Sequence, residues 1–186
     1  MKIFSSHIVF VSFFLLLLGP IVSVSAAEFI LQASETSVVV GKTFTVTVNL
    51  TGGEPTLGTD MVLSFDPDRL IVKIIQTSPL YPTYNPVGEK RIDQENGVVT
   101  LSGSGGIGQE VSAEGEFATI MFKAIKPGQA TIGVDYTPGE TNKSGIIDPK
   151  GAELMSVAPS PVTLVIKDQS PLQKFFAFFT ALFQKK

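Results

Sequence analysis

The residues that decide the fold are 43–50, TFTVTVNL, in which polar and apolar side chains alternate without a break. The apolar set is Phe44, Val46, Val48 and Leu50, and three threonines and an asparagine fill the other positions. Successive side chains of a β-strand point to opposite faces, so this period of two predicts a strand with one face in a core and the other in water. Threonine and valine also suit a pleated, half-buried surface.

Further strands are predicted on both sides of this segment, with glycine and proline between them. Asn96-Gly97 indicates a hairpin because both residues tolerate a positive φ. Lys126-Pro127-Gly128 indicates another turn. No amphipathic helical pattern separates the strands, so the sequence predicts an all-β antiparallel sandwich. The other predicted strands are Phe29–Ala33, Ser37–Val40, Met61–Phe65, Leu70–Ile75, Val98–Leu101, Phe117–Ile125, Ala130–Tyr136 and Val162–Lys167.

The N-terminal segment 1–27 is predicted to be a secretory signal peptide. Lys2 supplies a positive charge, Ile8–Leu18 is an almost unbroken apolar run, and small residues end the segment, which permits cleavage after Ala26 or Ala27. A retained membrane helix is the alternative, and the run is short against the ~20 residues that a span needs. The sequence therefore predicts a secreted, extracellular protein, with residues 28–167 as its domain.

The composition excludes several kinds of chemistry. The chain has no cysteine and no tryptophan, and its one histidine, His7, lies in the predicted signal peptide. Ser-His-Asp and Cys-His catalysis, and zinc binding by His or Cys, are therefore excluded for the mature chain. The formal net charge is -3, whereas nucleic-acid binding favours clustered lysine and arginine. What remains is carboxylate chemistry, oxygen-ligated calcium, or binding without catalysis.

Two motifs invite a catalytic or ligand-binding interpretation. Residues 103–108 match GxGxxG, but no helical pattern follows, so we interpret them as a loop and not as a nucleotide site. Asp66-Pro67-Asp68 holds two carboxylates with Arg69 beside them. Glycosidase carboxylates face each other across a substrate, whereas these neighbours are typical of a turn after a strand. A calcium ligand and a catalytic pair are the weaker alternatives.

The C-terminal segment 172–186 is predicted to form an amphipathic helix after a short linker at 168–171. Ser170 and Pro171 suit the N-cap and first helical positions. The apolar stretch gives only ~14 Å of helix, against ~30 Å of bilayer core, so it suits the membrane interface. Packing on the sandwich or on a second copy, and a strained span, are the alternatives. The predicted membrane-contact residues are Phe175, Phe176, Phe178, Phe179, Leu182 and Phe183.

Three stretches resemble the cohesin domain: GKTFTVTVNLTG at 41–52, LGTDMVLSFDPDRLIVKII at 57–75, and GEFATIMFKAIKPGQATIGV at 115–134. They are similar to a G-x-x-F-x-V-x-V strand, a strand that ends in an Asp-Pro turn, and a late G-x-φ-A-x-I-x-F strand of that family. The resemblance runs from Phe29 to Lys167. It implies a jelly-roll sandwich of about nine strands and non-catalytic binding of a dockerin, a small calcium-loaded helical module on polysaccharide-degrading enzymes. A carbohydrate-binding-module sandwich is the nearest similar fold.

The resemblance also implies a binding face on the sandwich. Asp60 matches an aspartate that the family carries six positions before the aspartate of the turn. Gly58-Thr59 stands where the family often has an asparagine, and Ser102-Gly103-Ser104 stands where an acidic residue often lies. The partner-binding residues implied in this way are Asp60, Thr59, Gly58, Ser102 and Ser104.

The sequence therefore predicts a non-catalytic extracellular module that recognises a dockerin-like module or is associated with polysaccharide binding and breakdown. No cofactor, metal, nucleotide or nucleic acid is expected. Direct carbohydrate binding is an alternative in which Tyr81 and Tyr84, in the long loop 77–90, would stack on sugars. A membrane-surface structural or assembly protein without a dockerin partner is another alternative, and a carboxylate glycosidase is the weakest.

Overall fold

The computed structural model describes residues 26–85 and 91–171, which form an all-β sandwich. Most of the predicted signal peptide lies outside these residues, as do the predicted C-terminal helix and its six membrane-contact residues. No helix within the described ranges is long and apolar enough to cross a bilayer. The described strands are β1 (Glu28–Ala33), β2 (Ser37–Val39), β3 (Thr43–Thr51), β4 (Pro55–Thr56), β5 (Gly58–Phe65), β6 (Leu70–Thr77), β7 (Thr83–Tyr84), β8 (Ile92–Asp93), β9 (Val98–Ser104), β10 (Val111–Ser112), β11 (Gly115–Ala124), β12 (Gly128–Val134), β13 (Gly145–Ile147) and β14 (Val162–Lys167).

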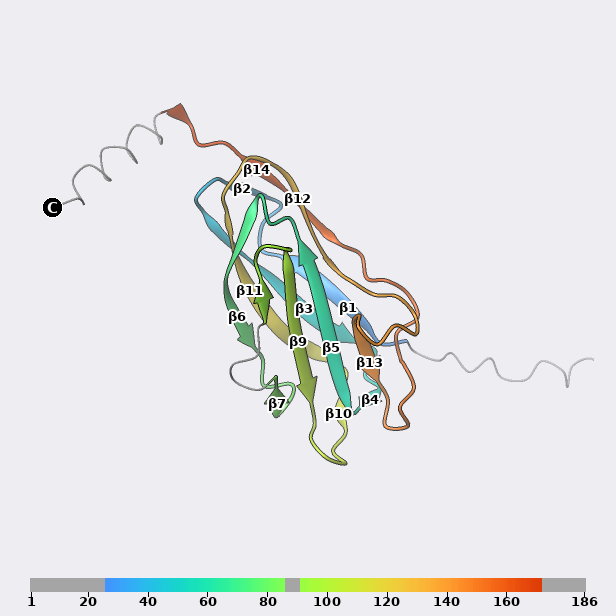
Figure 1. The fold of residues 1–186 in the computed structure, drawn as a ribbon. Helices are drawn as coiled ribbons and strands as arrows, with labels where there is room; N and C mark the ends of the chain where they lie inside the picture. Colours follow the sequence, from blue (N-terminus) through green and yellow to red (C-terminus); the bar gives the residue numbers. More distant parts are fainter. Residues whose placement is uncertain (1–25, 86–90, 172–186) are drawn as a thin grey trace, which may run out of the picture.

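The strand predicted from TFTVTVNL is β3, and its alternation is confirmed by burial. Its four apolar side chains are at most 3 % exposed, and the residues between them are partly or fully exposed. β3 lies inside the first sheet, whose order is β1-β3-β11-β6 (Figure 1) and whose pairs are all antiparallel. Val48, for example, stands between Leu31 of β1 and Ala118 of β11. A neighbour on each edge gives the backbone of β3 hydrogen-bond partners on both sides.

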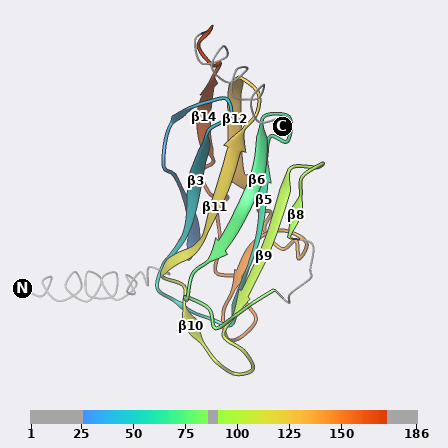
Figure 2. The same cartoon turned by 90° about the vertical axis from the view of Figure 1, so that its left-hand side faces the viewer.

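The second sheet has the order β2-β14-β12-β5-β9-β7 and positions the candidate site. Two strands share one edge of β5, because residues 63–65 pair with β12 and residues 58–60 pair with β13. β9 pairs along the other edge of β5, and β8 lies beside β9 in Figure 2. The predicted antiparallel arrangement holds for the described pairs except β2–β14, which is parallel.

Aromatic rings fill much of the space between the two sheets. Phe122 of β11 stacks on Phe44 with ring centroids 5.6 Å apart and meets Phe65 edge-on at 5.5 Å. Further along β11, Phe117 packs edge-on against Tyr81 at 5.9 Å. Aromatic pairs of this kind contribute about 0.5–1.5 kcal/mol each beyond the area they bury. Rings contributed by both sheets therefore hold the layers together without a disulfide.

The predicted turn at Asp66-Pro67-Asp68 and the predicted hairpin at Asn96-Gly97 both form. The Asp66 carboxylate accepts the backbone N–H of Asp68 at 3.0 Å and forms an ion pair with Arg69 at 2.5 Å. Both of its oxygens are thus used inside the turn between β5 and β6, which confirms the structural interpretation of this acidic pair. The hairpin at Asn96-Gly97 joins β8 to β9, and the glycine takes a positive φ of 68°.

Candidate partner-binding face

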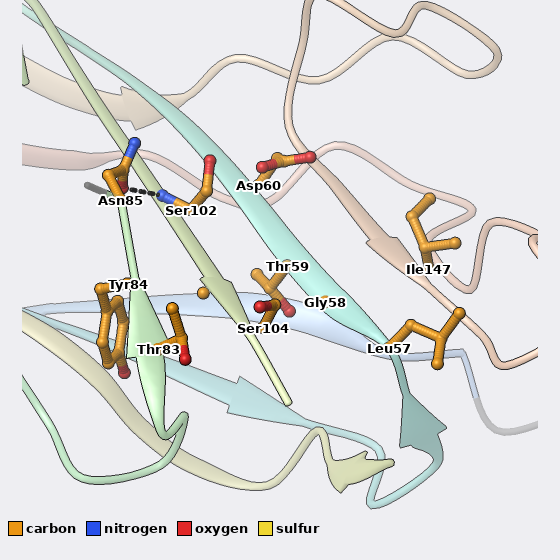
Figure 3. Close-up of a pocket in the computed structure, with 11 residues that line it drawn as sticks. Leu57, Gly58, Thr59, Asp60, Thr83, Tyr84, Asn85, Ser102, Ser104 and Ile147 are labelled. Atoms are coloured by element: carbon orange, nitrogen blue, oxygen red, sulfur yellow. Dashed lines mark hydrogen bonds between the residues drawn. The ribbon is translucent and has the colours of Figure 1, made fainter. Parts of the chain in front are cut away.

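Four adjacent strands, β13, β5, β9 and β7, form a hollow of about 380 Å³ on the outer face of the second sheet (Figure 3). The register places Ile147 beside Gly58, Gly58 beside Ser104, and Ser104 beside Thr83. Because the two central residues have little or no side chain, the floor is low between the outer strands. We name this hollow the trench; it is lined by Leu57, Gly58, Thr59, Asp60, Thr83, Tyr84, Asn85, Ser102, Gly103, Ser104 and Ile147.

Asp60 is the one carboxylate among the residues that line the trench. Its side chain is exposed, and no other described residue forms a hydrogen bond or ion pair with it. Its register neighbours are Gly145 on β13 and Ser102 on β9. Figure 3 shows Asp60, Ser102 and Asn85 in one row across the strands. An unpaired surface carboxylate between small residues is open to a donor from a partner.

Thr59 points into the core, so its predicted role as a contact residue is corrected. It is 1 % exposed, and its hydroxyl oxygen lies 2.7 Å from the Tyr81 hydroxyl oxygen in a buried hydrogen bond. The reason is the period of two along β5: Gly58 and Asp60 face outward, so the residue between them faces inward. Thr59 belongs to the floor of the trench, but its hydroxyl is already used inside the protein.

The serines of the trench lie in a strand and not in a loop. The sequence predicts a strand that ends at Leu101 and a loop at residues 103–108, but β9 continues through Ser104. Ser102 and Ser104 are half-exposed on the outer face. Gly103 between them faces the core, where a Cβ would lie 2.6 Å from the ring of Tyr81. The GxGxxG match therefore begins inside a β-strand, away from any helix N-terminus in the described residues.

Of the two tyrosines predicted to stack on sugars, only Tyr84 is partly exposed. Tyr81 is 2 % exposed, so its ring cannot stack on a sugar, and that prediction is corrected. Burial raises the pKa of Tyr81 above its ordinary value of 10.0, although the hydrogen bond with Thr59 opposes the shift. Tyr84 lines the trench, but it packs against Tyr81 and Phe117, and its hydroxyl donates to the Phe117 carbonyl at 3.1 Å.

One wall of the trench is apolar, and the sequence analysis did not identify it. Leu57 and Ile147 are half-buried, and the N–H of Leu57 donates to the carbonyl of Ile147 at 2.9 Å. Thr56 holds this wall in place: its hydroxyl oxygen lies 2.6 Å from the Ile147 carbonyl oxygen and accepts the N–H of Gly58 at 3.0 Å. Leu57 could have been identified from the sequence, because it is the first residue of the second cohesin-like stretch. Ile147 lies in a segment without periodicity.

A second hollow of about 320 Å³ shares Asp60 with the trench. Its lining includes Glu140, Glu153 and Lys143. Lys143 forms an ion pair with Asp135 at 2.6 Å, and this bond raises the pKa of Lys143 above its ordinary value of 10.5. The surface around Asp60 is therefore negative. Within the described ranges, no group of three or more His, Cys, Asp or Glu side chains is placed to hold a metal ion.

The family model for the cohesin domain matches residues 29–159, which is more than half of the chain and includes every strand that lines the trench. The chain belongs to the cohesin domain family. Cohesin domains are non-catalytic binding modules, so membership of the family confirms that this cohesin is not an enzyme. A search of curated proteins gives no significant match.

Solved cohesins share the fold of this cohesin. The third ScaC cohesin of Acetivibrio cellulolyticus, in complex with the ScaB dockerin, has a TM-score of 0.60 at 16 % identity and covers 75 % of this chain and 99 % of its own. The cohesin module of a Clostridium perfringens family 33 glycoside hydrolase gives 0.58 at 13 %, with coverages of 78 % and 99 %. The Clostridium thermocellum cohesin of the Coh-OlpA–Doc918 complex gives 0.57 at 16 %, with 76 % and 99 %. Identities this low show the fold alone.

Proposed function

We propose that this cohesin is an extracellular scaffolding module that holds a dockerin-like helical module in the trench. The observation that carries this proposal is the exposed, unpaired carboxylate of Asp60 above a floor of small residues. Two of the similar cohesins were solved with dockerins bound, which supports the same class of partner here.

The width of the trench also supports a helical partner. Ile147 and Thr83 stand on strands that are three strand spacings apart, which is about 14 Å. An α-helix with its side chains is about 10–12 Å wide. One helix laid along β5 and β9 therefore fits between the outer strands, and it can approach closely because Gly58 and Ser104 offer little side chain.

Pull-down with dockerin-bearing proteins tests this function. The full chain should retain such a protein, and Asp60→Ala should weaken binding at least tenfold because it removes the one charged group of the trench. The matched control is Asp68→Ala, which removes an exposed aspartate from the turn after β5 and should bind like the wild type. Equal retention of the wild type and the Asp60 variant would remove Asp60 from the interface.

The location that we propose rests on the sequence. Segment 1–27 has the pattern of a signal peptide, and segment 172–186 has the amphipathic pattern of a helix that lies in a membrane interface. Liposome flotation of the full chain and of a chain that ends at Pro171 tests the second role. Identical distributions of the two chains would end the membrane assignment.

Direct polysaccharide binding is the weaker candidate. Sugar stacking needs an exposed planar ring, and of the two tyrosines proposed for it only Tyr84 lines the trench with any exposure, while Tyr81 is buried. Affinity electrophoresis in soluble polysaccharides should therefore leave the mobility of the wild type unchanged. A retardation that Tyr84→Ala abolishes would favour this second function.

A further inference from the structure

The apolar wall of the trench has side chains that the core does not use. Leu57 and Ile147 are half-buried, yet neither belongs to the hydrophobic cluster that fills the sandwich nor to the partly buried residues packed against it. They lie side by side on the outer face (Figure 3). Thr56 is fully buried beneath them and hydrogen-bonds to both strands of the wall. The protein therefore holds two aliphatic side chains in fixed positions at the edge of the proposed interface.

The wall and Asp60 are separated by a distance that matches one turn of a helix. Ile147 is level with Gly58, and Asp60 lies two residues further along β5, which is about 6.8 Å along a strand. Residues i and i+4 of an α-helix lie on one face and are about 6 Å apart along its axis. A helix that runs along β5 can therefore contact both the apolar wall and Asp60 with two residues that are four positions apart.

The charges around Asp60 favour a positive charge on the helix residue that faces it. Asp60, Glu140 and Glu153 share the hollow beside the trench, and the only cation lining it, Lys143, is paired with Asp135. One oxygen of the Glu153 carboxylate, Oε1, is buried without a hydrogen-bond partner. A cationic side chain next to Asp60 would meet a negative potential that no other residue lining the hollow neutralises.

We propose that one helix of the partner carries an aliphatic side chain against Leu57 and Ile147 and, four residues away on the same face, a lysine or arginine against Asp60. This inference rests on the proposed function, and it names the chemistry that selects the partner. The aliphatic contact contributes binding energy beside the part of the trench where Gly58 and Ser104 offer little side chain. The cationic contact fixes the register of the helix along β5.

A displayed library tests this pairing without knowledge of the natural partner. The probe is a yeast-displayed two-helix dockerin scaffold in which the exposed face of one helix is randomised, selected with the full chain in calcium. Selected helices should be enriched in Leu, Ile, Val or Met at one position and in Lys or Arg four positions before or after it. Failure to select any helical binder would overturn the proposed function itself. Binders without this pair would overturn the present inference alone.

Matched variants of the cohesin test the two halves of the pair with one selected binder. Leu57→Ser with Ile147→Ser should weaken binding about thirtyfold, the scale of an interface hot spot. The control is Ile74→Ser, which changes an aliphatic side chain that is 53 % exposed on the opposite sheet and should bind normally. Circular dichroism and thermal melting verify that each variant is folded.

Charge exchange tests the contact with Asp60. Asp60→Lys should abolish binding of the selected helix, and exchange of the helix's cationic residue for glutamate should restore binding to that variant. Restored binding would identify the two side chains as direct neighbours. Loss of binding that the exchange does not restore would contradict the assigned register, and unchanged binding of Leu57→Ser with Ile147→Ser would contradict the apolar contact.

Discussion

The hydroxyl oxygens of Thr59 and Tyr81 lie 2.7 Å apart in a buried hydrogen bond on the inner side of the sheet that bears the trench. Thr59 belongs to β5, and Tyr81 precedes β7, so this bond joins the central strand of the trench to the segment that forms its far side. The position of Thr83 and Asn85 at the trench therefore depends on a hydrogen bond that is buried inside the protein.

Removal of the Tyr81 hydroxyl should destabilise the fold. Tyr81→Phe leaves the Thr59 hydroxyl buried without this partner, and an unsatisfied buried polar group costs about 1–3 kcal/mol. The free energy of unfolding from urea denaturation at pH 7 measures the loss. Thr59→Val in the same chain removes the orphaned hydroxyl and should recover most of the stability. Strictly additive losses for the two substitutions would contradict a direct bond between the two side chains.

Stability should fall at alkaline pH. Burial raises the folded-state pKa of Tyr81 and of Tyr136 above the ordinary value of 10.0, so the folded protein binds these phenolic protons more tightly than the unfolded chain does. The resulting stabilisation is complete below pH 10.0 and is lost as the pH rises through the folded-state pKa. Urea midpoints between neutral pH and pH 11 measure this loss, which should be smaller for Tyr81→Phe. If the urea midpoint falls equally steeply with pH for Tyr81→Phe and for the wild type, Tyr81 does not cause the loss of stability.

The part of the fold that follows from local pattern could be predicted from the sequence. The alternation along residues 43–50 gives both the strand and its buried face, because side-chain direction in a strand depends only on position. The same rule applied to β5 places Thr59 inward, next to outward Gly58 and Asp60. The predicted strand begins only at Met61, and the family resemblance gives Thr59 a position beside Asp60 but not the direction of its side chain.

The rest of the site depends on pairings between distant parts of the chain. Ile147 belongs to a strand of three residues, which is too short to show a periodicity, and it reaches the trench only because β13 pairs with β5. Tyr81 is buried because Gly103, far along the chain, leaves room for its ring. Neither contact has a local signal, so the sequence predicts a long loop over 77–90, whereas the described residues 78–85 pack against β9 and β11.

The first residue of β12, which packs against Arg69 of the turn after β5, offers a test of backbone strain. Gly128 has a φ of 134°, and a Cβ on it would lie 2.7 Å from Nε of Arg69. Gly128→Ala should therefore lower the free energy of unfolding by about 1–3 kcal/mol, as measured by urea denaturation. When Arg69 is also changed to alanine, the clash with its side chain is removed. Gly128→Ala should then lower the free energy of unfolding only by the cost of the φ angle. Gly133→Ala, at a glycine without a positive φ, is the control and should cost less.

Gly103→Ala should lower both the stability of the fold and binding at the proposed interface. The new Cβ would lie 2.6 Å from the Tyr81 ring and 3.0 Å from Phe117, so the ring must move and carry Thr83 and Asn85 with it. Overpacking of this kind costs about 1–3 kcal/mol, and retention of a dockerin-bearing protein in the pull-down should fall as well. Ser102→Ala shortens the adjacent trench residue without overpacking, so it should melt like the wild type. A Gly103→Ala variant with unchanged melting and unchanged retention would show that Tyr81 does not set the shape of the trench.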